Sequence, residues 1–281
     1  MRYWVRLDRD VVTVGGAEAE PFLQGQLSQD VAALAPGSSG WSWLLAPTGK
    51  VDALVRVSRR AGGDWVLDTD AGWGEAALAR LQRFKLRTRA DLALSPATVI
   101  GLRGEGWEAA GDVVCAPPWP GVDGADVILL GEDRSFAPPD GAVEMALDAY
   151  QAVRIQAGQP RMGAELGERT IPGETGLVPF TVSFTKGCYT GQELVARIDS
   201  RGGNVPRHLC RLRLDAPVAP GTDLLDGDTA AGVVTSVADL APAGAGSGWV
   251  GLGYVRRGFE APRTLAAGPG GPAAHVEPLP W

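Results

Sequence analysis

The sequence predicts an α+β protein built from two or three packed units. The chain has 281 residues, more than one compact domain usually holds. Helix-like and strand-like segments alternate through the first part of the chain, whereas only strand-like segments follow residue 207. We therefore expect an α+β region over 1–206 and a small all-β unit over 207–281.

Composition and charge narrow the class of protein. Apolar residues make up 45% and charged residues 21%, as in ordinary globular proteins, and no apolar run reaches the roughly 20 residues that cross a bilayer. The N-terminus alternates charged and apolar residues, unlike a secretion signal. We expect a cytoplasmic protein with no membrane partner. A net charge of −7 disfavours a broad nucleic-acid-binding surface.

Cysteine and histidine are scarce, which limits the available chemistry. The 3 cysteines, Cys115, Cys188 and Cys210, are far apart, and the chain has 2 histidines. An odd number of cysteines without a CxxC pair argues against a disulfide framework and against a structural zinc site. We predict reduced thiols and no metal site.

Periodicity predicts the elements of the first half. Apolar residues at helical spacing indicate a helix over 17–35, which Pro36-Gly37 ends, and a second helix is expected over 74–87. Segments with strand character, separated by turn sequences, lie at 40–46, 51–58, 64–70, 91–95 and 97–104. These strands and the covering helix indicate an α+β layer.

The rest of the chain contains fewer predicted helices and strands. Residues 104–141 are rich in Gly, Pro and Asp, so we expect irregular connections around one short strand at 126–130. An apolar stripe predicts a long helix over 142–158. Three strand-like segments after residue 207, with Pro/Gly-rich turns between them, account for the all-β unit.

The segment KGCYTGQE (186–193) holds the main candidate for chemistry. Thr190 and Glu193 have the spacing of a capping box, which predicts a helix that begins at Thr190. Cys188 then lies just outside the helix N-terminus, where unpaired amides favour an anion, and Lys186 adds positive charge. Both effects favour a thiolate, so we interpret Cys188 as a reactive thiol. The alternative is a small apolar filler.

Other candidates have structural interpretations too. Glu193 either caps the helix or contacts a ligand, and Tyr189 either stacks on a ligand or packs in the core. For Arg197, one turn after Glu193, an ion pair with that residue is favoured over ligand contact. Cys115, in a proline-rich connection, and Cys210, in a strand pattern, are expected to be packing residues.

Five segments together resemble the YgfZ family, relatives of the glycine-cleavage T protein. They are FLQGQLSQDV (22–31), RFKLRTRADL (83–92), RIQAGQPRMG (154–163), FTKGCYTGQELVAR (184–197) and GLGYVRR (251–257). The resemblance spans nearly the whole chain. It implies a three-domain, T-protein-like fold, with two interleaved α+β domains in 1–206, the middle one at about 40–103, and a small C-terminal β-barrel over 207–281.

The resemblance also implies a function. Family members bind tetrahydrofolate in a central channel and act in the synthesis or repair of iron–sulfur proteins, so the implied partners are a folate and iron–sulfur client or assembly proteins. The family motif maps onto Lys186, Gly187, Cys188, Tyr189, Gly191 and Gln192, and Cys188 matches the functional cysteine. The candidate folate-binding residues are Gln156, Glu165, Tyr189, Gly191, Gln192, Glu193 and Arg197.

Two positions depart from the T-protein pattern. T protein carries adjacent aspartates after its Gly-rich turn, one of them its catalytic acid, whereas here Ala53 follows Asp52; this argues against aminomethyl transfer. The helix motif R-[IL]-E-A-G has Gln156 in place of the glutamate that resembles a pterin clamp. Glutamine keeps one acceptor and presents a donor, at a cost of roughly 1–3 kcal/mol in binding. Glu165 and Glu174 are alternative partners, each expected to be a solvated surface acid.

Three hypotheses follow. The first is a folate-dependent accessory factor for iron–sulfur proteins, with Cys188 as a redox or cluster-transfer thiol; because one cysteine cannot hold a cluster, further ligands must come from elsewhere. The second is a folate-dependent aminomethyltransferase or N-demethylase that uses Asp52. The third is a folate-binding scaffold with an inert thiol. The sequence leaves open whether the protein is an enzyme.

Overall fold

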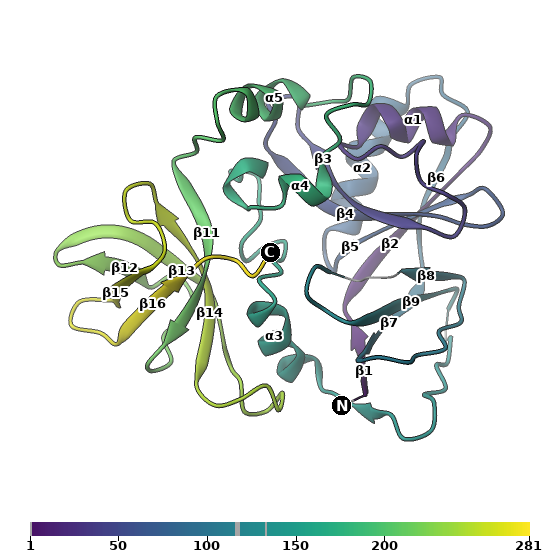
Figure 1. Ribbon diagram of the computed structural model, residues 1–281. Coiled ribbons are helices and arrows are strands. Elements are labelled where there is room, and N and C mark those ends of the chain that lie inside the picture. Colours follow the sequence, from purple (N-terminus) through teal and green to yellow (C-terminus); the bar gives the residue numbers. More distant parts are fainter. Residues whose placement is uncertain (1, 116–118, 133) are drawn as a thin grey trace.

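The chain folds into two five-stranded sheets and a closed β-barrel (Figure 1). The computed structural model describes residues 2–115, 119–132 and 134–281. The helices lie on and between these strand layers, so the α+β fold with a small C-terminal barrel is confirmed. Among the described residues, no helix is long and apolar enough to cross a membrane.

The second sheet is formed by the consecutive strands β2 to β6, which are inserted between β1 and β7 of the first sheet. The first has the order β10-β1-β7-β9-β8, with bounds Val143–Glu144, Tyr3–Leu7, Ala97–Arg103, Gly124–Leu130 and Val113–Cys115. The second has the order β3-β4-β5-β2-β6, with bounds Ser39–Leu45, Val51–Arg59, Trp65–Asp70, Arg9–Gly15 and Asp91–Ser95. Only Asp8 separates β1 from β2, so the chain crosses between sheets within one residue. Strand β7, inside 40–103, pairs with β1 and β9, so the second sheet ends at Ser95.

Helices α1 (Ala19–Gln26) and α2 (Gly74–Lys85) cover the second sheet. Their apolar faces contribute Leu23 and Leu81, both fully buried against Val55 and Leu67 of the sheet. Burying such side chains contributes about 1.5–3 kcal/mol each. Helix α3 (Leu147–Gln156) lies between β1 and the barrel (Figure 1). The chain between α3 and the barrel forms η1 (Pro172–Glu174), α4 (Val178–Thr181) and α5 (Gln192–Ser200).

The barrel begins at Arg207 and its last strand ends at Glu277. Its strands β11 to β16 have the bounds Arg207–Leu214, Asp223–Asp226, Thr229–Asp239, Trp249–Arg256, Arg263–Ala267 and Ala273–Glu277. Strand β11 pairs with both β14 and β16, which closes the barrel. Closure leaves no unpaired sheet edge.

Two of the predicted helices are wrong over part of their length. The helix predicted over 17–35 ends at Gln26, because Leu27 adopts extended backbone and bridges to Leu44 of β3. The helix predicted over 142–158 begins at Leu147, because Val143–Glu144 pairs in parallel with β1. In both cases strand pairing with a distant segment outweighs local helical spacing.

The irregular region predicted over 104–141 contains more strand than expected. Strand β9 is longer than the predicted 126–130, and β8 was not predicted. Cys115 lies at the end of β8 rather than in a connection, and its thiol is buried beside the Ser58 hydroxyl at 3.3 Å.

A buried ionic network joins the two sheets. Arg56 of β4 donates to Asp68 of β5 at 3.0 Å and to Asp126 of β9 at 2.6 Å, and Arg103 of β7 donates to the other oxygen of Asp126 at 2.7 Å. Burial alone raises the pKa of Asp126, but the Arg103 and Arg56 guanidiniums outweigh it and hold the pKa at about 2. Asp126 therefore stays ionised and couples the sheets.

Candidate functional site

Three adjoining hollows lie between the sheets, the loop after α3 and the barrel. Arg154 and Arg161 line the first two, and Gly163 and Thr235 line the second and third. We call them the inner, middle and outer hollows and, together, the central channel. Their volumes are about 80, 580 and 940 Å³, so the inner hollow is the smallest of the three.

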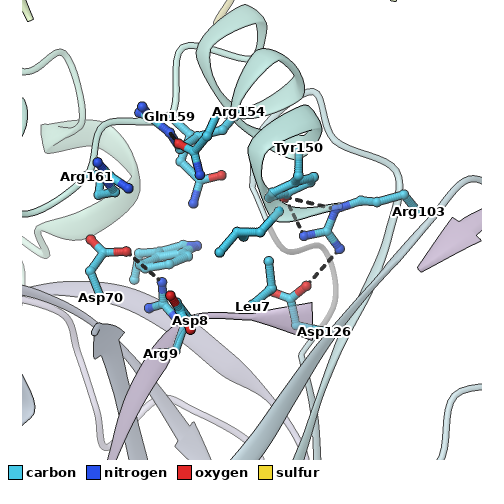
Figure 2. A pocket seen from close by; sticks show the side chains of 13 residues that line it. Leu7, Asp8, Arg9, Asp70, Arg103, Asp126, Tyr150, Arg154, Gln159 and Arg161 are labelled. Carbon is cyan, nitrogen blue, oxygen red and sulfur yellow. Dashed lines mark hydrogen bonds and ion pairs between the residues drawn. The ribbon is translucent and has the colours of Figure 1, made fainter. Parts of the chain in front are cut away.

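The inner hollow is lined by polar side chains from both sheets and α3 (Figure 2). Asp70 accepts from Arg9 at 3.2 Å and from the Met162 amide at 2.8 Å. The Tyr150 hydroxyl accepts from Arg103 at 2.6 and 3.1 Å. The full lining is Leu7, Asp8, Arg9, Trp41, Asp70, Arg103, Asp126, Leu147, Tyr150, Gln151, Arg154, Gln159 and Arg161. This arrangement offers fixed acceptors, donors and one indole to a small polar group.

Glu165 forms the channel wall between α3 and the barrel. One carboxylate oxygen accepts from Arg154 at 3.2 Å and from the Arg161 amide at 3.0 Å, and the other accepts from the hydroxyls of Thr235 at 2.8 Å and Ser236 at 2.5 Å. The side chain is buried, so the expectation of a solvated surface acid is wrong. A charge-balancing arginine and two hydroxyls compensate its desolvation.

The same expectation is wrong for Glu174. Its carboxylate is buried and accepts from Arg207 of β11 at 3.1 Å. In both cases a distant arginine neutralises the acid, and sequence spacing does not reveal such a partner.

The capping box predicted in KGCYTGQE is wrong. Helix α5 begins at Gln192, and its N-cap is Gly191, with a left-handed φ of 83°. A Cβ at Gly191 would lie 2.5 Å from a carbonyl oxygen of the β3–β4 turn, so this close approach requires glycine. Gln192 accepts from the Tyr189 amide at 3.1 Å, while Thr190 makes no cap bond. The loop is thus held against the β3–β4 turn.

Lys186 anchors this loop to the end of α1. Its ammonium donates to the carbonyls of Gln24, Leu27 and Gln29 at 2.7, 2.7 and 2.9 Å. Burial lowers the pKa of Lys186 to about 8, against a smaller opposing effect of Asp30. The three N–H donors all have backbone partners, so these contacts are structural.

Replacing Lys186 with methionine is expected to lower the free energy of unfolding by roughly 2–4 kcal/mol, because buried carbonyls lose their donors. Urea unfolding followed by circular dichroism measures the change. The matched control is Lys50→Met, since the exposed Lys50 side chain makes no hydrogen bond or ion pair with any described residue, and it should change stability by less than about 0.5 kcal/mol. Equal effects of the two changes would contradict the anchoring role.

Cys188 is exposed in the loop before α5, whereas Cys115 and Cys210 are buried, as expected for packing residues. Burial raises the pKa of Cys210 to about 11. Cys188 is therefore the accessible thiol among the three, and its reactivity stays a prediction.

Several other candidates lie away from the channel. Gln156 is exposed and lines a separate hollow near Tyr3 and Pro280. Tyr189 packs in the core beneath the loop, where burial raises its pKa to about 12. Glu193 and Arg197 are both exposed; within the described part of the chain no ion pair joins them, so that predicted pair is wrong.

Asp52 lies beside α2 rather than in the three hollows. Its carboxylate accepts from Arg80 at 3.1 Å. Burial raises the pKa of Asp52, and the Arg80 charge opposes this rise. Across the ranges that the structure describes, no three His, Cys, Asp or Glu side chains gather as metal ligands do.

The two sheets and the closed barrel place this protein in the class with the glycine-cleavage T-protein fold. The crystal structure of glycine cleavage system aminomethyltransferase T from Bartonella henselae superposes with a TM-score of 0.83 over 99% of this chain and 86% of that chain. Sequence identity is 21%, so this similarity defines the fold alone.

Sequence relatives identify the family. An uncharacterized protein of Haemophilus influenzae is 30% identical over 200 residues, 69% of this chain and 67% of that protein. The tRNA-modifying protein YgfZ of Klebsiella pneumoniae is 27% identical over 225 residues, 70% of this chain and 67% of that protein. No family model matches the chain. The chain belongs to the YgfZ family.

Proposed function

We propose that the protein binds tetrahydrofolate or a derivative in the central channel, with the pterin ring in the inner hollow. The polar lining of that hollow carries the proposal. A pterin edge presents an amine and an N–H beside a carbonyl oxygen, and these groups pair with carboxylate acceptors and guanidinium donors. Asp8 and Asp70 supply the acceptors, Arg161 supplies donors, and Trp41 supplies an aromatic surface.

The charges of Asp8 and Arg161 are the strongest support. Neither side chain has an ion-pair partner in the ranges described, although both line the inner hollow. Asp70 uses one site on each carboxylate oxygen and keeps further acceptor capacity. These carboxylates take over the acceptor role that the family pattern gives to the position of Gln156, which lies outside the channel.

Calorimetric titration with tetrahydrofolate under anaerobic conditions tests this assignment. Wild type is expected to bind, Asp8→Asn to bind about tenfold more weakly through loss of a charged acceptor, and Gln156→Glu to bind like wild type. Asp8 is exposed and its side chain makes no hydrogen bond or ion pair with the residues that the structure describes, so its substitution should leave stability unchanged. Absence of binding by wild type would sink the folate assignment. Tighter folate binding by Gln156→Glu would indicate that residue 156, rather than Asp8 and Asp70, accepts the hydrogen bonds of the pterin.

We assign to Cys188 a role in the synthesis or repair of iron–sulfur proteins. Its thiol is exposed on the family loop, and Lys186 and Gly191 hold that loop in place. Cluster ligands beyond this one cysteine would come from a partner. Because a relative bears the name tRNA-modifying protein, a tRNA-modifying iron–sulfur enzyme is the first client to assay.

Complementation tests the thiol. In cells that lack this protein, wild type and Cys210→Ser should restore the activity of iron–sulfur enzymes, whereas Cys188→Ser should not. Restoration by Cys188→Ser at equal protein level would favour the scaffold hypothesis. Aminomethyl transfer is less well supported, since Asp52 lies outside the hollows and is ion-paired with Arg80.

A further inference from the structure

Three tryptophans form a chain of ring contacts between two hollows. The Trp41 and Trp119 ring centroids are 5.0 Å apart and those of Trp119 and Trp281 are 5.9 Å apart, both pairs edge to face. Trp41 lines the inner hollow. Trp281, in the segment after β16, lines a hollow of about 320 Å³ together with Cys210 of β11 and Val255 of β14, which we call the barrel hollow. The three rings therefore connect one end of the central channel with the barrel.

The packing around Trp281 fixes the outer end of this chain. A Cβ at Gly158, just after α3, would lie 2.7 Å from the Trp281 ring, so glycine leaves the space that the ring occupies. Phe180 of α4 packs against the same ring, with the centroids 6.1 Å apart. The contact between Trp119 and Trp281 is thus part of a packed cluster.

The middle ring differs from the two end rings in its surroundings. Trp119 is 2% exposed, and its Nε1 has no hydrogen-bond partner among the described residues. A tryptophan that loses an electron and cannot release its indole proton stays a radical cation, which readily takes an electron from a neighbouring indole. Trp41 and Trp281 line hollows, where water can accept the proton. A one-electron oxidation therefore passes through Trp119 and stops at either end.

The charges near Trp41 permit a radical cation there. The guanidiniums of Arg9 and Arg56 lie 5.4 and 5.3 Å from its ring centroid. Both are ion-paired with Asp68, and Arg9 is also paired with Asp70 at 3.2 Å. These carboxylates offset the positive field that the two arginines would otherwise exert on the ring.

The barrel hollow also contains a thiol. Burial raises the pKa of Cys210 to about 11, so this thiol stays protonated. A protonated thiol gives up an electron less readily than a thiolate. Trp281 is therefore the better electron donor at the barrel hollow.

We propose that Trp41, Trp119 and Trp281 form an electron relay from the inner hollow to a strong one-electron oxidant at the barrel hollow. The oxidant takes one electron from Trp281, which is refilled from Trp119, and Trp119 is refilled from Trp41. With no donor in the inner hollow, Trp41 loses its indole proton to water and remains as a neutral radical. A tetrahydropterin there supplies one electron and one proton instead, and a second oxidising equivalent converts it to the dihydropterin. This last step rests on the proposed folate function, whereas the relay does not.

Oxidation by photogenerated tris(bipyridine)ruthenium(III), with a cobalt(III) complex as the final electron acceptor, tests the relay. The ruthenium complex removes one electron at a time and is too large to enter the inner hollow of about 80 Å³. Mass spectrometry of peptides then measures the oxidation of each tryptophan. In wild type, Trp281 and Trp41 should be oxidised and Trp119 spared. In Trp119→Phe, oxidation of Trp41 should be lost while that of Trp281 remains.

Two further variants complete this test. Trp281→Phe, at the half-buried outer end, should also abolish oxidation of Trp41 through a change outside the fully buried core. The matched control is Trp43→Phe, which removes another buried indole whose Nε1 lacks a partner among the described residues, and which takes part in none of the ring contacts of the relay. It should leave oxidation of Trp41 as in wild type.

Oxidation of Trp41 that persists in Trp119→Phe and Trp281→Phe would overturn the relay, as would its absence from wild type. A stoichiometric amount of tetrahydrofolate tests the donor: it should protect Trp281 in wild type and not in Trp119→Phe. Equal protection in both proteins would overturn folate as the donor and leave the relay standing. Calorimetric absence of folate binding would remove the folate assignment, while the oxidation pattern without folate still decides the relay.

Discussion

Replacing Asp126 with asparagine is expected to lower the free energy of unfolding by about 3–5 kcal/mol, the cost of breaking a buried ion pair. The change leaves Arg56 and Arg103 buried between the sheets without their shared negative charge. Urea unfolding measured by circular dichroism gives the difference. Asp123→Asn is the control, because Asp123 lies exposed just before β9 and, among the described residues, its side chain makes no hydrogen bond or ion pair.

The buried charge of Asp126 should also make the free energy of unfolding depend on pH. The pKa of Asp126 is about 2 when folded and about 3.9 when unfolded. Because the pKa is lower in the folded state, the carboxylate contributes its full stabilisation at pH values above the unfolded pKa. This stabilisation is lost as the pH falls from the unfolded pKa toward the folded pKa. Between about pH 4 and pH 2, wild type should therefore lose stability more steeply than Asp126→Asn. Parallel curves would show that Asp126 does not hold its charge in the folded state.

Replacing Glu165 with glutamine is expected to cost about 3–5 kcal/mol as well, because it leaves Arg154 buried without a counter-charge. Glutamine also replaces one carboxylate oxygen, an acceptor, with an NH₂ donor, which disrupts the hydrogen bonds that the Thr235 and Ser236 hydroxyls of the barrel donate. Urea unfolding measures the loss, and the barrel should unfold before the sheets.

Glu168→Gln makes the same chemical change three residues further along the same loop, at an exposed side chain. It should alter stability by less than about 0.5 kcal/mol. Similar losses in the two variants would contradict the role of Glu165 as the link between α3 and the barrel.

Local patterns predicted much of the fold. The alternation at 40–46 and 51–58 and the strand-like runs after residue 207 correspond to β3, β4, β11, β13 and β14. The helix over 17–35 failed because Val31 and Leu34, which also fit helical spacing, face the core from turns. The short strands β12, β15 and β16 form only when the barrel closes. Their pairing partners lie outside any short stretch of sequence, so local patterns do not predict them.

The candidate site was less predictable. A local motif predicted Cys188 as the candidate thiol. The residues around Glu165 and Asp8, in contrast, include segments far away in sequence, which local patterns do not reveal. One signal was present: Arg56 and Asp126 each interrupt an apolar strand sequence, and a charge in such a strand is typical of a buried pair. Sequence spacing does not show which arginine pairs with which acid.

The single residue between β1 and β2 has a mechanical consequence. A second one-residue link, Pro96 between β6 and β7, also joins the sheets, so any rotation of one sheet relative to the other is restrained at both Asp8 and Pro96. Displacement in a rotation grows with distance from the axis, so side chains at this axis move least. The inner hollow, which Asp8 itself lines, therefore lies where a rotation between the sheets would displace side chains least.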